Sequence, residues 1–186
     1  GSTNSYGSGF SDFWLIKTNS NGEAIWNKTY GGPRWDAANS VIETNDRGYI
    51  AAGGTNSFGS GYQDFWLVKT DQNGLMQWNN TYGGPYDDCA YAVQQTDDLG
   101  YIVCGYTGSF GAGFEDFWLI KTDSDGNMIW NKTYGGGNSE YAYIAEQTND
   151  DGYIIAGSTY SSTTEFDIFL VKADSSGNMQ WSKTYG

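Results

Sequence analysis

Carboxylate and ammonium side chains recur at a fixed spacing along this chain of 186 residues. Four times an aspartate opens the segment D-[F/I]-[W/F]-L-x-K, which ends in a lysine five residues later. The aspartates are Asp12, Asp64, Asp116 and Asp167, and the lysines are Lys17, Lys69, Lys121 and Lys172. A rim of carboxylates could bind a divalent cation, because hard cations prefer oxygen ligands. Recurrence in every copy is what a turn-capping or unit-joining role predicts, and we favour that role.

Composition narrows the chemistry that this chain can perform. Histidine is absent, which removes the usual general base, the usual zinc ligand and imidazole-dependent triads, so that carboxylate-based enzymes remain. The formal net charge of −13 disfavours nucleic acids and anionic membrane surfaces as partners, since both need a positive patch. No apolar run is long enough to span a bilayer. We therefore expect no bound nucleic acid and no membrane insertion, and we assign no catalytic residue, no metal and no cofactor.

The two cysteines, Cys89 and Cys104, lie in the same stretch of the chain. If the residues between them form a hairpin that turns at 97–100, the residue opposite Cys104 is near Val93, several residues from Cys89. A disulfide requires its two Cα atoms within about 7 Å. We therefore predict two buried free thiols.

The elements that position these residues repeat along the chain. The four aspartates lie 52, 52 and 51 residues apart, and a period in this range is typical of stacked or ring-forming supersecondary units. Each period reads as four short strands, which in the first copies are 12–18, 24–30, 37–44 and 49–53. An Asn-Gly or Asp-Gly pair joins the first two strands in three copies, a strong signal for a two-residue hairpin.

All connections within a period are short, which favours an antiparallel meander, and repeating such sheets around an axis protects their edges. We therefore predict an all-β fold, a β-propeller of four-stranded antiparallel blades with about 52 residues each. The chain divides into a half blade at 1–31 and three blades at 32–83, 84–135 and 136–186, which is three and a half blades in one propeller or propeller fragment. A half blade leaves open strand edges, so we expect another copy of the chain or neighbouring repeats to complete the ring.

The combined pattern D-F-W-L-x-K-T-D-x-x-G-N-x-x-W-x-x-T-Y-G-G-x-x-x-D-x-A, followed by D-G-Y-I-x-A-G-x-T, covers essentially the whole chain. It resembles the prokaryotic seven-bladed β-propeller repeat family of large secreted and cell-surface proteins. It is more distantly similar to the tryptophan-docking blades of quinoprotein-type propellers, in which a turn glycine precedes a tryptophan, as Gly22 precedes Trp26. The residues that hold a quinone in catalytic quinoproteins cannot be identified, so we do not expect their oxidoreductase activity.

This resemblance implies an extracellular or cell-surface location and assigns the strands of each blade. The segment after Tyr-Gly-Gly is the innermost strand A, Y-I-x-A-G is strand B, D-F-W-L-x-K-T is strand C, and the tryptophan segment is the outermost strand D. Trp26 and Tyr30 of strand D recur in the other copies, and we expect these rings to fill the space between blades.

Differences between the copies concentrate in two loops, one after Tyr-Gly-Gly at 33–36, 85–88 and 137–140, and one before strand C, as at 108–114 and 160–166. In a propeller with this strand order both loops emerge on the same face. We predict an acidic recognition surface there that carries a few exposed aromatic rings. Its residues are Trp35, Asp36, Tyr86, Asp87, Asp88, Glu115, Glu140 and Glu165. The alternative is sequence drift in unconstrained loops.

Three N-x-T sequons share one repeat position on the outermost strand, at Asn27, Asn79 and Asn131. Glycans at these positions would line the rim of a surface protein. The alternative, which we favour, is that N-K-T is simply good sequence for a strand edge.

Together these features predict a non-catalytic extracellular propeller that serves adhesion, surface or matrix assembly, or recognition of protein or glycan ligands. The alternative is a carboxylate-dependent enzyme acting on polysaccharides, a lyase or hydrolase, with its site on the loop face or in the channel. An enzyme needs one asymmetric group of acids, whereas this chain repeats its acids, which favours binding or structure. A third alternative is a spacer within a larger surface assembly.

Overall fold

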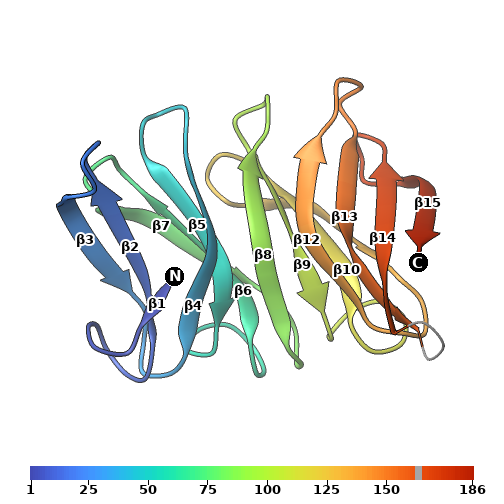
Figure 1. Ribbon diagram of the computed structural model, residues 1–186, viewed down its shortest axis with the longest axis horizontal. Coiled ribbons are helices and arrows are strands. Elements are labelled where there is room, and N and C mark those ends of the chain that lie inside the picture. Colours follow the sequence, from blue (N-terminus) through green and yellow to red (C-terminus); the bar gives the residue numbers. More distant parts are fainter. Residues whose placement is uncertain (162–164) are drawn as a thin grey trace.

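The computed structural model describes residues 1–161 and 165–186, and every regular element in that part of the chain is a β-strand. Four antiparallel sheets follow one another along the chain, and Figure 1 shows them side by side in chain order. The first sheet contains β1 (Ser2–Thr3), β2 (Asp12–Thr18) and β3 (Ala24–Tyr30). The second contains β4 (Asp36–Glu43), β5 (Tyr49–Thr55), β6 (Asp64–Thr70) and β7 (Met76–Tyr82).

The third and fourth sheets repeat the pattern of the second. The third contains β8 (Asp88–Gln95), β9 (Tyr101–Thr107), β10 (Asp116–Thr122) and β11 (Met128–Tyr134). The fourth contains β12 (Glu140–Gln147), β13 (Tyr153–Ser161), β14 (Glu165–Ala173) and β15 (Met179–Tyr185). Each four-stranded sheet pairs its strands in chain order, as the meander prediction requires, and the fold is all-β with propeller blades of about 52 residues.

The first sheet contains the two expected strands C and D and a short third strand. Ser2 pairs with Phe13, and Thr3 pairs with Asp12, so that β1 occupies the place that strand B takes in the other sheets. Within the described chain the first sheet therefore lacks strand A and most of strand B.

Strand A begins one residue earlier than the sequence analysis placed it, and it contains a bulge in each complete sheet. The acid that opens it pairs with the last threonine of strand B, as Asp36 pairs with Thr55. The register then shifts by one residue, which leaves one extra residue on strand A in each case. These extra residues are Asn39, Tyr91 and Tyr143. A bulge bends a strand and redirects a side chain, so simple alternation does not hold along strand A.

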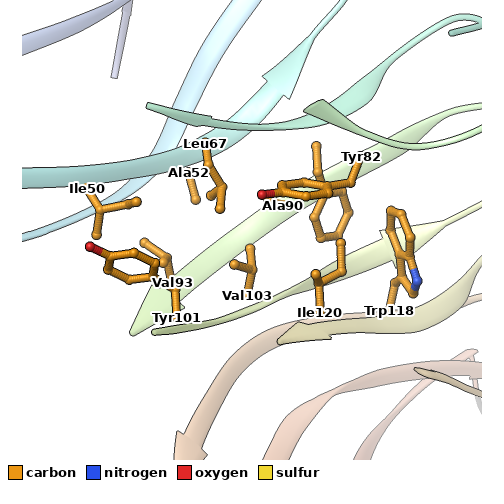
Figure 2. Packing of buried hydrophobic residues seen from close by; sticks show 11 residues of the cluster. Ile50, Ala52, Leu67, Tyr82, Ala90, Val93, Tyr101, Val103, Trp118 and Ile120 are labelled. Carbon is orange, nitrogen blue, oxygen red and sulfur yellow. The ribbon is translucent and has the colours of Figure 1, made fainter. Parts of the chain in front are cut away.

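Neighbouring sheets pack through side chains that recur in every repeat. Each of three buried clusters joins two adjacent sheets, and Figure 2 shows the one between the second and third sheets. In it Trp118 lies edge-on to Phe65 with ring centres 4.7 Å apart. The strand D tyrosine also bonds to the next sheet, because Tyr30 Oη donates to the carbonyl of Gly74 at 2.6 Å and Tyr134 Oη repeats the bond. These strand D rings therefore join adjacent blades, as expected.

The strands A of neighbouring sheets converge. The Asn39 side chain on β4 donates to the carbonyl of Ala90 on β8 at 2.9 Å. Just after the ends of β4 and β8, a glutamine of the next blade accepts a backbone hydrogen bond: Gln95 Oε1 accepts from Asn45 N at 2.9 Å, and Gln147 Oε1 accepts from Asp97 N at 3.0 Å. In Figure 1, β4, β8 and β12 lie beside one another, while β3 and β15 lie at the two ends of the row. Strand A is thus the inner strand of each blade.

Both cysteines are free and buried, which confirms the prediction made for them. Cys104 pairs with Ala92 across the β8–β9 hairpin, whereas Cys89 pairs with Tyr106, so the two thiols lie at different positions along the hairpin. Burial raises the pKa of each thiol to about 12, which keeps both protonated and poorly nucleophilic.

The described residues include no helix that is both long and apolar enough to cross a membrane.

Candidate functional site

The loops from strand D to the next strand A (D–A loops) and from strand B to strand C (B–C loops) lie at one end of the sheets. They are joined by backbone hydrogen bonds, since Asn56 N donates to the carbonyl of Trp35 at 2.8 Å and Asp88 N donates to that of Gln63 at 2.7 Å. We call this surface the loop face. Its existence follows from the strand order, as the sequence analysis predicted.

Three of the eight residues assigned to the recognition surface are not exposed on it. Asp36 and Asp88 are fully buried, and Glu140 is only 3% exposed. Asp88 accepts hydrogen bonds from Thr107 Oγ1, from Ser109 Oγ at 2.8 Å and from Gly84 N at 2.8 Å. Asp36 and Glu140 bond to equivalent groups of their own blades. The prediction that these three acids are exposed is wrong, because each carboxylate is used to tie a D–A loop to strand B, and Asp36 and Asp88 also bond to the B–C loop.

The other five residues remain at least partly accessible. Trp35 and Tyr86 are 55% and 59% exposed, and the side chains of Asp87 and Glu165 are exposed too. Glu115 is half-buried and accepts a hydrogen bond from Ser139 Oγ. Part of the variable loop at 160–166 lies outside the described residues, which resume at Glu165.

The loop face also exposes aromatic rings that the sequence analysis did not select. Phe10, Tyr62 and Phe114 occupy one repeat position in the B–C loops, and each is more than 60% exposed. Phe10 stacks on Trp35, with ring centres 6.1 Å apart and planes 6° apart. Two glycines that precede each of these rings hold positive φ values, such as φ 92° at Gly61 before Tyr62. These rings recur between copies, so a search for differences passed over them, although an aromatic residue directly after a glycine in a loop was a usable signal.

Asp12, Asp64 and Asp116 open strand C and are buried, whereas Asp167 is half-buried and lies two residues inside β14. Asp64 and Asp116 hold the B–C loop. Asp64 accepts from Ser60 N at 2.6 Å, and Asp116 accepts from Ala112 N at 2.8 Å. Burial raises the pKa of both Asp64 and Asp116 to about 6, and the adjacent acid of strand A, Asp88 or Glu140, contributes to this rise. In residues 1–161 and 165–186 no three acidic or sulfur side chains lie together as a metal site. The contacts support the turn-holding role.

The strand C lysines lie at the opposite end of the sheets. Lys69 and Lys121 are buried and pair with aspartates of the turn between strands A and B, with Lys69 Nζ 2.7 Å from Asp46 Oδ2 and Lys121 Nζ 2.8 Å from Asp98 Oδ2. Although burial alone would raise the pKa of Asp46, the hydrogen bond from Lys69 lowers it to about 2. The lysines therefore fasten the turns of this face.

Hollows on the lysine face recur between blades. One of about 410 Å³ is lined by Lys69, Trp78 and Tyr101, and one of about 360 Å³ is lined by the equivalent residues one blade on. Equivalent hollows at each junction are what blade packing produces. A dedicated site would differ from one junction to the next.

Comparison with known proteins finds a distant relative. The tRNA wybutosine-synthesizing protein 4 of Aspergillus fumigatus is 27% identical over a comparison of 165 residues, and the match covers 83% of this chain and 14% of that protein. The similarity is distant and partial. No family model matches the chain. The chain spans about a seventh of the length of the Aspergillus fumigatus protein.

The sequons lie on the outer strands, as the repeat position required. Asn27, Asn79 and Asn131 are all exposed, on β3, β7 and β11. Asn79 Oδ1 accepts a hydrogen bond from Trp66 Nε1 at 3.1 Å, and Asn131 accepts the same bond from Trp118 at 3.2 Å. Asn79 and Asn131 thus have a structural use that does not depend on a glycan.

Proposed function

We propose that this chain is a non-catalytic extracellular recognition module that binds protein or glycan ligands through its loop face. The observation that carries the proposal is the concentration of exposed aromatic rings there, including Trp35, Tyr62, Tyr86 and Phe114. Exposed aromatic groups of this kind mark binding surfaces, because they supply large contact areas at low cost in side-chain entropy. The extracellular location is supported by the resemblance to secreted propeller repeats.

A carboxylate-dependent enzyme is the weaker alternative. A carboxyl group with a pKa near 6 beside a second acid, such as Asp64 beside Asp88, is the type of group that serves as a general acid. Here the pairs recur in successive blades, and Asp64 and Asp88 are only 2% and 0% exposed. A polysaccharide substrate needs direct access to such a group, so these pairs favour a structural use.

The loop face is tested with a variant built from the repeat itself. Trp35 and Tyr86 are replaced by the residues that the third D–A loop carries at those positions, giving Trp35→Ser and Tyr86→Asn. We expect the double variant to lose at least about tenfold in affinity for whatever the intact chain binds on arrays of glycans and peptides, since one or two aromatic contacts are worth more than 1 kcal/mol.

The matched control is Leu99→Asp, which replaces an exposed residue of the lysine face by the one that the next repeat carries. It should bind normally. Equal binding by the loop-face variant and the intact chain, or no array ligand for the intact chain, would contradict the proposal.

We further propose that another copy of the chain, or neighbouring repeats, completes the ring. Tyr185 is 55% exposed, whereas its equivalents Tyr30, Tyr82 and Tyr134 are at most 8% exposed and bond to the next sheet. At the other end, a hollow of about 620 Å³ beside Trp14 occupies the place of the inner strands. Light scattering should give the mass of two copies for the intact chain, and a monomer at the highest soluble concentration would argue against this pairing.

A further inference from the structure

The repeat breaks down at one place on the inner side of the third and fourth blades. Where the second blade carries Ala37, Asn39 and Gly54, the later blades place tyrosines at four of the six equivalent positions. These are Tyr91, Tyr106, Tyr141 and Tyr143, which we call the inner tyrosine cluster. The second blade forms the same strands without them, so the strands themselves do not require these rings.

The four rings form a continuous surface across two blades. The ring of Tyr91 lies 5.7 Å from that of Tyr106 and 5.5 Å from that of Tyr143, and Tyr106 lies 5.2 Å from Tyr141. The surface continues to Phe166, whose ring centre is 6.5 Å from that of Tyr141. Tyr91 and Tyr143 are the extra residues of the strand A bulges, so the bulge determines where these two side chains point.

The cluster differs from the aromatic rings that pack between blades. Trp66 and Trp118 are 1% exposed, but Tyr143 is 54% exposed and Phe166 is 60% exposed. The other three tyrosines are half-buried. Rings in this arrangement support one another laterally and keep part of their faces open to a ligand.

Negative charge lies beside these rings. Burial raises the pKa of Tyr141, and the carboxylate of Glu115 raises it further. The negative charge of Asp87 likewise raises the pKa of Tyr106. The basic residues lie elsewhere, on strands C and D, in one turn of the lysine face and in the second blade's D–A loop. They are Lys17, Lys28, Arg34, Arg47, Lys69, Lys121, Lys132, Lys172 and Lys183.

We propose that the inner tyrosine cluster, with Asp87 and Glu115, binds positively charged side chains of a partner protein, arginine above all. A cation over a tyrosine face is attracted by the ring quadrupole, and arginine also stacks on aromatic planes. The chain already contains one such contact, with Lys17 Nζ 5.3 Å from the ring centre of Tyr49. The net charge of −13 would draw a cationic segment toward this surface. This inference rests on the proposed recognition function and names its partner class.

The test measures binding of a fluorescent tetra-arginine peptide by anisotropy. The variant Tyr91→Asn/Tyr143→Asn introduces the residue that the second blade carries at Asn39, so it should fold, and thermal unfolding checks this. We expect it to bind the peptide at least about tenfold more weakly, while Tyr143→Phe, which keeps the ring, stays within about twofold of the intact chain.

A charge-matched pair of variants separates the cluster from general attraction to an acidic protein. Asp87→Asn/Glu115→Gln should weaken binding about fivefold or more, whereas Asp97→Asn/Asp125→Asn, which removes two exposed charges from the lysine face, should leave it unchanged. Equal weakening by both pairs would overturn the inference. So would binding of a neutral cellohexaose, but not of tetra-arginine, at the cluster. If the intact chain fails to bind tetra-arginine while Trp35→Ser/Tyr86→Asn still weakens binding of an array ligand, the inference about the cluster is wrong and the loop-face proposal is supported.

Discussion

The free energy of unfolding is expected to decrease as the pH rises from about 4.5 to about 7, because two buried carboxyl groups lose their protons in this range. The pKa of Asp64 and that of Asp116 are both raised to about 6 in the folded chain, from 3.8. Between these values the folded state binds more protons than the unfolded state. The stability that protonation supplies is therefore complete below about pH 4 and is lost as the pH rises through about 6.

The expected effect is large, because a pKa difference of this size corresponds to up to about 3 kcal/mol for each carboxyl group. The opposite trend appears only in stronger acid. The pKa of Asp46 is lowered to about 2 by its bond to Lys69, so the stability from that pair is lost as the pH falls from about 4 toward 2. The free energy of unfolding should thus be greatest at about pH 4 to 5.

Urea unfolding at several pH values measures this directly. The variant Asp64→Asn/Asp116→Asn keeps an oxygen for the loop N–H groups but cannot ionise, so it should be more stable than the intact chain at about pH 7 and nearly independent of pH down to about 4.5. Asp151→Asn, at an exposed aspartate of the lysine face, is the control and should keep the normal slope. A variant that retained the full pH dependence would show that other groups cause it.

Adjacent residues in the third blade should respond very differently to the loss of a carboxylate. Asp88→Ala removes the acceptor of three hydrogen bonds and leaves a buried donor of Thr107 and half-buried donors of Ser109 and Gly84 unpaired. We expect a loss of about 3 kcal/mol, since each unpaired buried group costs about 1 to 3 kcal/mol and relief of repulsion with Asp64 offsets part of the total. A domain is stable by only about 5–15 kcal/mol, so this effect is easily measured.

Asp87→Ala is the matched control, because its side chain is exposed and its neighbour's is buried. It should change the free energy of unfolding by less than about 0.5 kcal/mol in the same urea experiment. Similar losses for the two variants would mean that the buried hydrogen bonds of Asp88 do not hold the loops together.

Much of the fold could be predicted because the sequence repeats. Strands C and D alternate regularly and end in Gly-containing turns, and the predicted 12–18 and 24–30 match Asp12–Thr18 and Ala24–Tyr30. Strand A was predicted one residue late. Its first acid pairs with a threonine 19 residues away, as Asp36 does with Thr55, and no local pattern shows such a contact.

The candidate site was predictable only in part, for related physical reasons. From sequence, a carboxylate in a loop with glycine and proline is expected to be exposed. Asp36 is nevertheless buried, because Thr55 and Ser57, which are distant in sequence, donate hydrogen bonds to it. The inner tyrosines were missed because the bulge breaks the two-residue alternation, so no face could be assigned to Tyr91 or Tyr143 from spacing.

The central claim is that buried side chains that recur in every repeat hold the blades together, whereas the exposed aromatic side chains of the loop face and the inner tyrosine cluster serve recognition. A saturation mutagenesis scan that reads folded protein by protease resistance tests it most directly. We predict that Trp66, Trp118 and Asp88 tolerate almost no substitution, while Tyr86 and Tyr143 tolerate most polar ones. If Tyr86 and Tyr143 proved as intolerant as Trp118, these rings would be structural and the claim would be contradicted.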